Sequence, residues 1–143
     1  MKIFTIGFTK TSAEYFFNRI KTSDAKAIID IRLNNVSQLA GFAKRDDLKY
    51  FLKTICGIDY LPMPQLAPTK EILDAFKKNG GQWNDYEHSF INLMENRKIE
   101  NIQKDILDHG CLLCSEDKPN FCHRRLVAEY LKNKWGDVEI IHL

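Results

Sequence analysis

Two kinds of hydrophobic pattern alternate along this chain. Short continuous apolar runs, typical of strands buried on both faces of a sheet, are separated by segments whose apolar residues recur at helical spacing. The apolar runs predict strands over residues 2–8, 25–32, 58–63, 111–115 and 138–143. The helical spacing predicts helices over residues 13–20, 48–55, 70–78, 83–95, 99–108 and 124–134.

This alternation predicts an α/β fold: a single, open, doubly wound, Rossmann-like sheet. Its five strands would be mostly parallel, with helices on both faces. All of residues 1–143 would form one domain, and residues 65–98 would contribute a helical lid or insertion. In open sheets of this kind, ligands bind beyond the carboxyl ends of the strands. That rule gathers the following polar residues onto one rim: Thr9, Asp30, Arg32, Gln65, Glu116 and Cys122.

Composition narrows the class of protein without naming its function. The formal net charge is +2 and no dense basic run occurs, which argues against a protein that coats nucleic acid. No apolar stretch approaches the ~20 residues of a membrane helix, and no export signal is recognisable at the start. We therefore expect a cytoplasmic protein that does not enter a membrane, whose four cysteines are free thiols or ligands.

The densest chemistry lies in residues 111–125, where a predicted strand, a polar loop and a helix follow one another. Cys122 directly precedes the helix, and a helix N-terminus favours a thiolate and lowers the thiol pKa. Cys122 could therefore be a nucleophile, or pair with Cys114 in a redox couple. Alternatively, it packs beneath the helix while His123 or Arg124 caps the loop.

A metal site built on Cys111-x2-Cys114 and Cys122-His123 is not expected. Cysteines three apart in a strand point to opposite faces, roughly 10 Å apart. A zinc ion needs sulfurs at about 2.3 Å around one centre. Only a knuckle turn at residues 111–114 would rescue the metal site.

Asp30 and Arg32 close the second strand and face the same side. Such a pair suits recognition of a ribose hydroxyl and a phosphate, or it forms a salt bridge at the strand end. Glu116 could act as a general acid or base, or hydrogen-bond the loop backbone. Residues 37–45, including Ser37, could cover the rim or form a solvated loop.

Several of these motifs together resemble the domain of unknown function 488 family. They are Thr5-Ile6-Gly7, Asp30-Ile31-Arg32, the Ser37/Gly41-Phe42 segment, Gly57-Ile58-Asp59-Tyr60 and Leu113-Cys114-x-Glu116…Cys122-His123-Arg124. The resemblance implies a compact prokaryotic α/β domain of Rossmann-like form, without an assigned activity. It carries over these site positions: Thr9, Asp30, Arg32, Ser37, Glu116, Cys122, His123 and Arg124. Phe8 departs from the family, which usually has histidine there, and the Gly-Gly of many relatives is absent near Gln65.

The leading hypothesis is an enzyme acting on a small phosphate-bearing or nucleotide-like ligand at the strand rim. Glu116, Cys122 and Asp30 would be catalytic, and no metal or other cofactor is expected. The ligand-binding residues would be Thr9, Arg32, Ser37, His123 and Arg124. A non-catalytic ligand sensor or adaptor is the alternative. Nucleic-acid processing, with Lys44 and Arg45 at phosphates, is a third hypothesis that the mild charge disfavours.

Overall fold

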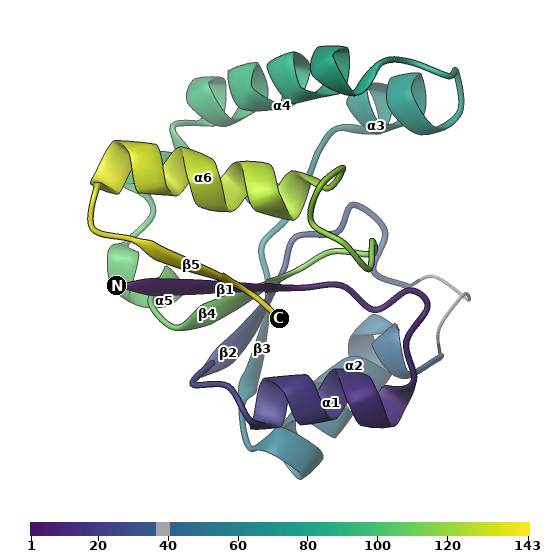
Figure 1. Ribbon diagram of the computed structural model, residues 1–143, viewed down its shortest axis with the longest axis vertical. Helices are drawn as coiled ribbons and strands as arrows, with labels where there is room; N and C mark the ends of the chain where they lie inside the picture. Colours follow the sequence, from purple (N-terminus) through teal and green to yellow (C-terminus); the bar gives the residue numbers. More distant parts are fainter. Residues whose placement is uncertain (37–40) are drawn as a thin grey trace.

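The computed structural model describes residues 1–36 and 41–143, and its centre is a sheet of five parallel strands (Figure 1). The strand order is β3-β2-β4-β1-β5, and every pairing is parallel. The strands are β1 (Lys2–Ile6), β2 (Ala27–Asp30), β3 (Asp59–Pro62), β4 (Gly110–Leu113) and β5 (Glu139–His142). The predicted doubly wound α/β fold is confirmed, with each strand shorter than its apolar run.

Helices cover both faces of this sheet. The longer ones are α1 (Ala13–Lys21), α2 (Arg45–Phe51), α3 (Lys70–Lys77), α4 (Trp83–Arg97) and α6 (His123–Trp135). Short turns of helix add η1 (Gly41–Ala43), η2 (Leu52–Cys56), η3 (Pro64–Leu66), η4 (Ile99–Asn101) and α5 (Lys104–Leu107). Among the residues that the structure describes, no helix is long and apolar enough to cross a membrane.

Alternating strand side chains divide the core into two layers. Ile3 and Leu112 face α6 and α4, whereas Phe4, Cys111 and Leu113 face α1 and α2. Both layers are largely apolar at their centres, which explains why the strands read as nearly continuous apolar runs. Figure 1 shows α1 and α2 on one side of the sheet and α6, with α3 and α4 beyond it, on the other.

The position of β4 creates the crevice that a ligand site needs. β4 lies between β1 and β2. After β4 the chain continues to α6 on one face of the sheet, whereas after β1 and β2 it continues to α1 and α2 on the other face. Loops that diverge to opposite faces leave a crevice at the carboxyl ends of the strands between them. The crevice between β2 and β4 is therefore a place for a ligand.

Local signals account for three of the helix ends. Ser12 caps α1 by accepting a hydrogen bond from the Tyr15 amide, and Thr69 caps α3 in the same way. Gly57 ends the α2–η2 helix in the left-handed conformation, with φ of 67°. The helix predicted over residues 99–108 is wrong. Contacts from α6 hold η4 as a separate turn, since Trp135 donates a hydrogen bond to the carbonyl of Glu100.

The second crevice, between β1 and β4, is closed by backbone contact. A Cβ atom added to Gly7 would lie 1.6 Å from the carbonyl oxygen of Glu116. The amides of Phe8 and Thr9 both donate to the carbonyl of Ser115, at 3.3 and 3.1 Å. Glycine at position 7 thus lets the end of β1 press against the loop after β4, and this contact fixes the loop that carries Cys114 and Glu116.

Candidate functional site

A cavity of about 280 Å³ occupies the crevice between β2 and β4. Residues 32–34 after β2 and residues 114–116 after β4 line it, together with side chains from α3, α4 and the start of α6. The cavity therefore lies at the carboxyl ends of the strands, where the fold class predicts a ligand. Residues 65–98 supply one wall of this cavity, and whether they move as a lid stays a prediction.

Aromatic side chains form that wall and the rim. Trp83 and Tyr86 of α4 are stacked, with ring centroids 4.9 Å apart and an angle of 20° between the rings. Phe76 of α3 and Phe121 of the loop before α6 meet Trp83 edge-on, at 5.4 and 5.5 Å. Phe121 is 62% exposed although it is a large apolar side chain. An exposed aromatic beside a cavity of this kind suits contact with a flat ring.

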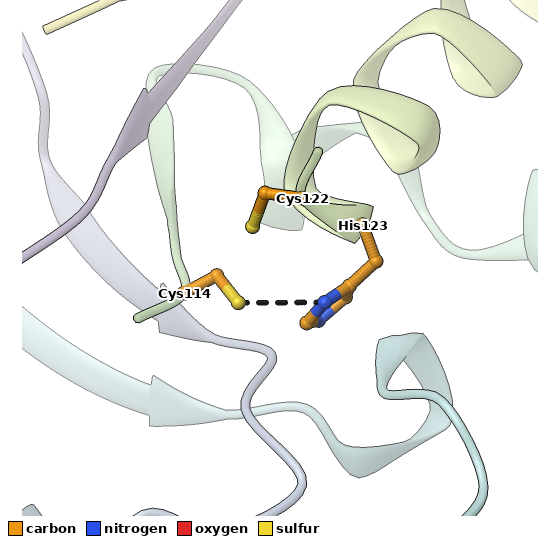
Figure 2. Close-up of side chains that lie close together, drawn as sticks. All are labelled: Cys114, Cys122 and His123. Carbon is orange, nitrogen blue, oxygen red and sulfur yellow. Dashed lines mark hydrogen bonds between the residues drawn. The ribbon is translucent and has the colours of Figure 1, made fainter. Parts of the chain in front are cut away.

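The floor of the cavity holds two thiols and an imidazole (Figure 2). Cys114 follows β4, Cys122 is the N-cap residue of α6, and His123 is its first residue. All three are buried, and their Sγ, Sγ and Nδ1 or Nε2 atoms lie within 4.8 Å of one another. Figure 2 shows the two sulfur atoms and the imidazole ring pointing toward a common centre.

The hydrogen bonds of His123 fix its tautomer. Nε2 lies 2.7 Å from the carbonyl oxygen of Ile31, which can only accept, so Nε2 carries a proton and donates it. In the neutral ring the Nδ1 lone pair is then free to face Cys114, whose Sγ lies 3.4 Å away. The Phe90 ring packs against the imidazole, with centroids 5.4 Å apart. The loop after β2 thus orients the side chain that reaches the thiol.

The two thiols differ in acidity. A hydrogen bond from Cys122, aided by the backbone amides of Ser115 and Glu116, lowers the pKa of Cys114. Burial, together with the neighbouring Cys114, raises the pKa of Cys122. This direction is the opposite of the one that a helix N-terminus alone predicts for Cys122. Burial is the largest cause of this direction.

Asp30 and Arg32 form a closed ion pair beneath the cavity. The Nε and Nη2 atoms of Arg32 donate to the Asp30 carboxylate at 2.9 and 2.8 Å, and the Arg32 amide adds a third bond. The Tyr60 hydroxyl donates to the same carboxylate at 2.5 Å. Both charged side chains are at most 2% exposed. Of the two predicted roles, the geometry shows the salt bridge.

Arg124 and Thr9 hold the loop after β4. Arg124 is 1% exposed and donates to the carbonyls of Glu116 and Asp117, at 2.5 and 3.3 Å. The Thr9 hydroxyl donates to the carbonyl of Ser115 at 2.9 Å. Neither side chain lines the cavity. Their ligand-binding role therefore stays a prediction, while their structural contacts keep Cys114 and Glu116 in place.

The Glu116 carboxylate stands at the mouth of the cavity. It accepts a hydrogen bond from Lys77 of α3 at 2.6 Å, and both side chains are a little under half exposed. This pair joins the loop after β4 to the helical wall. Ser37, the remaining predicted binding residue, lies outside the described residues.

A family model whose description is a domain of unknown function, DUF488, matches residues 12–131. The chain belongs to the DUF488 family. The resemblance inferred from its motifs is thus confirmed over most of the chain. Neither a curated protein nor a solved structure matches the sequence significantly.

The departure of this DUF488 member at Phe8 has a visible consequence. Phe8 is buried, and the Arg32 guanidinium lies over its ring, 5.2 Å from the centroid. A cation over an aromatic face is stabilised by the ring quadrupole. Phe8 therefore supports the Asp30–Arg32 pair, and it does not line the cavity.

The structure brings together Arg32, Glu116, Cys122 and His123 from the predicted set, and it adds residues that sequence reasoning did not select. The sequence predicts only a redox or metal role for Cys114, although it lies next to the end of the predicted strand, in the Leu-Cys-x-Glu motif. Trp83, Tyr86 and Phe121 carry no spacing signal that separates a cavity wall from a core. Their role follows only from the packing of α3 and α4 over the strand ends.

Proposed function

We propose that this DUF488 protein is an enzyme that acts on a small, ring-bearing, nucleotide-like molecule in the cavity between β2 and β4. The observation that carries the proposal is an aromatic-walled cavity whose floor is a buried cluster of two thiols and an imidazole. The ring would stack beside Trp83 and Phe121, because an aromatic side chain can stack on any base, whatever its identity. Its reacting atom would lie near Cys114 and His123.

Charge at the mouth supports a ligand with an anionic group. Lys77 is nearly half exposed, and its ion pair with Glu116 crosses the mouth of the cavity in solvent, so it can turn toward a phosphate at modest cost. Arg32 and Arg124 are not free to do so, since their guanidinium groups are buried in contacts with the protein. Glu116 remains our candidate for moving a proton. The four free thiols support placing the protein in a reducing compartment such as the cytoplasm.

Tryptophan fluorescence tests the binding part of this proposal. A Trp135→Phe protein retains Trp83 as its sole indole, at the wall of the cavity. The probes are the common nucleosides and their 5′-monophosphates, with inorganic phosphate as the ring-free control. We expect saturable changes in Trp83 emission with ring-bearing probes. A protein that binds none of them, or binds phosphate equally well, contradicts the proposal.

A matched pair of variants locates the binding. Phe121 and Tyr50 are both exposed aromatic residues, at 62% and 64%, but only Phe121 lines the cavity. We expect Phe121→Ala to weaken binding about tenfold, the effect of losing one stacking contact, and Tyr50→Ala to leave it unchanged. Chromatography of the incubated probes then separates the two function classes. Binding without conversion favours a sensor, whereas a product establishes an enzyme.

A further inference from the structure

We infer that Cys114, Cys122 and His123 bind a zinc ion through Sγ, Sγ and Nδ1, with a fourth coordination position open to the aromatic cavity. This inference adds a metal to the reactive centre of the proposed function. The catalytic role of the metal rests on that proposed function, but its binding does not. The metal site itself depends on the three side chains alone.

The geometry of the cluster fits a tetrahedral ion. With Zn–S and Zn–N bonds of about 2.3 and 2.1 Å, a sulfur and a nitrogen on one tetrahedral centre lie about 3.6 Å apart. The Sγ atom of Cys114 lies 3.4 Å from Nδ1 of His123, and every pair of ligand atoms lies within 4.8 Å. Small rotations of the side chains suffice to close the remaining distance around one ion.

The outer contacts of His123 are those of a metal ligand. A histidine that binds a metal usually donates its second ring N–H to a carbonyl or carboxylate, which fixes the tautomer and the ring plane. Here Nε2 donates to the carbonyl of Ile31 at 2.7 Å, so the Nδ1 lone pair is directed at the thiols. Phe90 packs against the same ring and restricts its rotation.

The charge balance suits a buried site. Zinc binding replaces two S–H bonds by two Zn–S bonds and releases both protons to solvent, so Zn²⁺ and two thiolates sum to zero. A neutral centre avoids the large cost of burying an unpaired charge among aromatic side chains. Thiolate and imidazole donors also favour zinc over magnesium or calcium, which prefer oxygen.

The expectation of no metal depended on Cys111 and Cys114 pointing to opposite faces of one strand, and the structure does keep Cys111 apart from the cluster. Cys111 packs in the core against α1 and α2, on the other face of the sheet. Cys114 follows the end of the strand and turns into the cavity with Cys122 and His123. All three of these ligands line the cavity, so the fourth position faces it. A zinc site with three protein ligands and an open position is the arrangement of catalytic zinc.

Cobalt and zinc titrations of the reduced, chelator-treated protein test the site without any organic ligand. We expect one Co²⁺ per chain, with sulfur-to-cobalt charge-transfer absorption and the visible bands of four-coordinate cobalt, displaced by Zn²⁺. Cys114→Ser and Cys122→Ser should each weaken zinc binding by more than ~100-fold, beyond the effect of losing an outer-shell contact. Cys56→Ser, which changes a thiol on the opposite face, should leave binding unchanged.

Thiol protection in the unmodified protein decides the matter if a serine variant fails to fold. Zinc should slow alkylation of Cys114 and Cys122, but not of Cys56, as read cysteine by cysteine by mass spectrometry. Absence of stoichiometric binding, or equal protection of Cys56, overturns the metal site. If the protein binds zinc but no nucleoside, only the proposed function is contradicted. If the protein binds nucleosides but takes up no zinc, only the metal site is contradicted.

Discussion

Removing the charge of Arg32 should destabilise the fold strongly, because it leaves the Asp30 carboxylate buried without its cation. Arg32→Met keeps the aliphatic stem but deletes both donors that now lie 2.9 and 2.8 Å from Asp30. Breaking one partner of a fully buried ion pair costs about 3–5 kcal/mol. With an m-value of about 2 kcal/mol/M in urea, the unfolding midpoint should fall by about 2 M.

An exposed ion pair provides the matched control. Arg45 and Asp46 lie 3.1 Å apart, but their side chains are 48% and 84% exposed, so Arg45→Met should leave the midpoint unchanged. The double variant Asp30→Asn/Arg32→Met should be more stable than the sum of its single variants indicates, since it removes both charges together. The assay is urea unfolding followed by circular dichroism.

Two results would refute this reasoning. One is an Arg32→Met protein whose midpoint matches that of Arg45→Met, which would mean that the buried pair contributes little. The other is strict additivity of Asp30→Asn and Arg32→Met, which would mean that the two charges are not coupled. If Arg32→Met remains folded but loses binding of every nucleoside monophosphate, Arg32 contacts ligand, as the sequence hypothesis had it.

Three further outcomes follow from other contacts. Gly7→Ala should cost about 3 kcal/mol or more in unfolding free energy, because its Cβ would overlap the Glu116 carbonyl, whereas Gly41→Ala meets no atom within 4 Å and should be neutral in the same urea assay. Partial desolvation at the end of β5 lowers the pKa of His142 in the folded state, so the unfolded chain binds more protons below about pH 6.5. The free energy of unfolding should therefore fall as the pH drops from 7 to 5, and less steeply in His142→Gln. Thr69→Ala should cost about 1 kcal/mol by removing the cap of α3, and equal stability of that variant would show that the cap is dispensable.

Local patterns in the sequence were sufficient to predict the strands of the sheet and the helices between them. Strand and helix periodicities placed all five strands and the five longer helices, and the alternation of strands and helices predicted the doubly wound class. The rule that ligands bind beyond the carboxyl ends of the strands also predicted that Arg32, Glu116 and Cys122 lie together, and all three line the cavity.

The directions of side chains could not be predicted in the same way. Arg32 turns inward because its guanidinium pairs with Asp30 and lies over the ring of Phe8. The contact with Phe8 joins the residues that follow β2 and β1, which are far apart in the sequence. Cys114 joins His123 only because α6 begins beside the end of β4. Such contacts depend on how elements pack, and no periodicity within one element encodes them.

The central place of β4 also bears on how the chain reaches this structure. β1 is flanked by β4 and β5, so the first 109 residues contain none of its strand partners. Only the pair of β2 and β3 can form earlier, and two strands alone are at best marginally stable. Pairings this distant in sequence close large loops and slow folding. The segment that carries Cys114, Cys122 and His123 thus begins with the strand that joins β1 to the pair of β2 and β3, so the centre of the sheet and the site would assemble together.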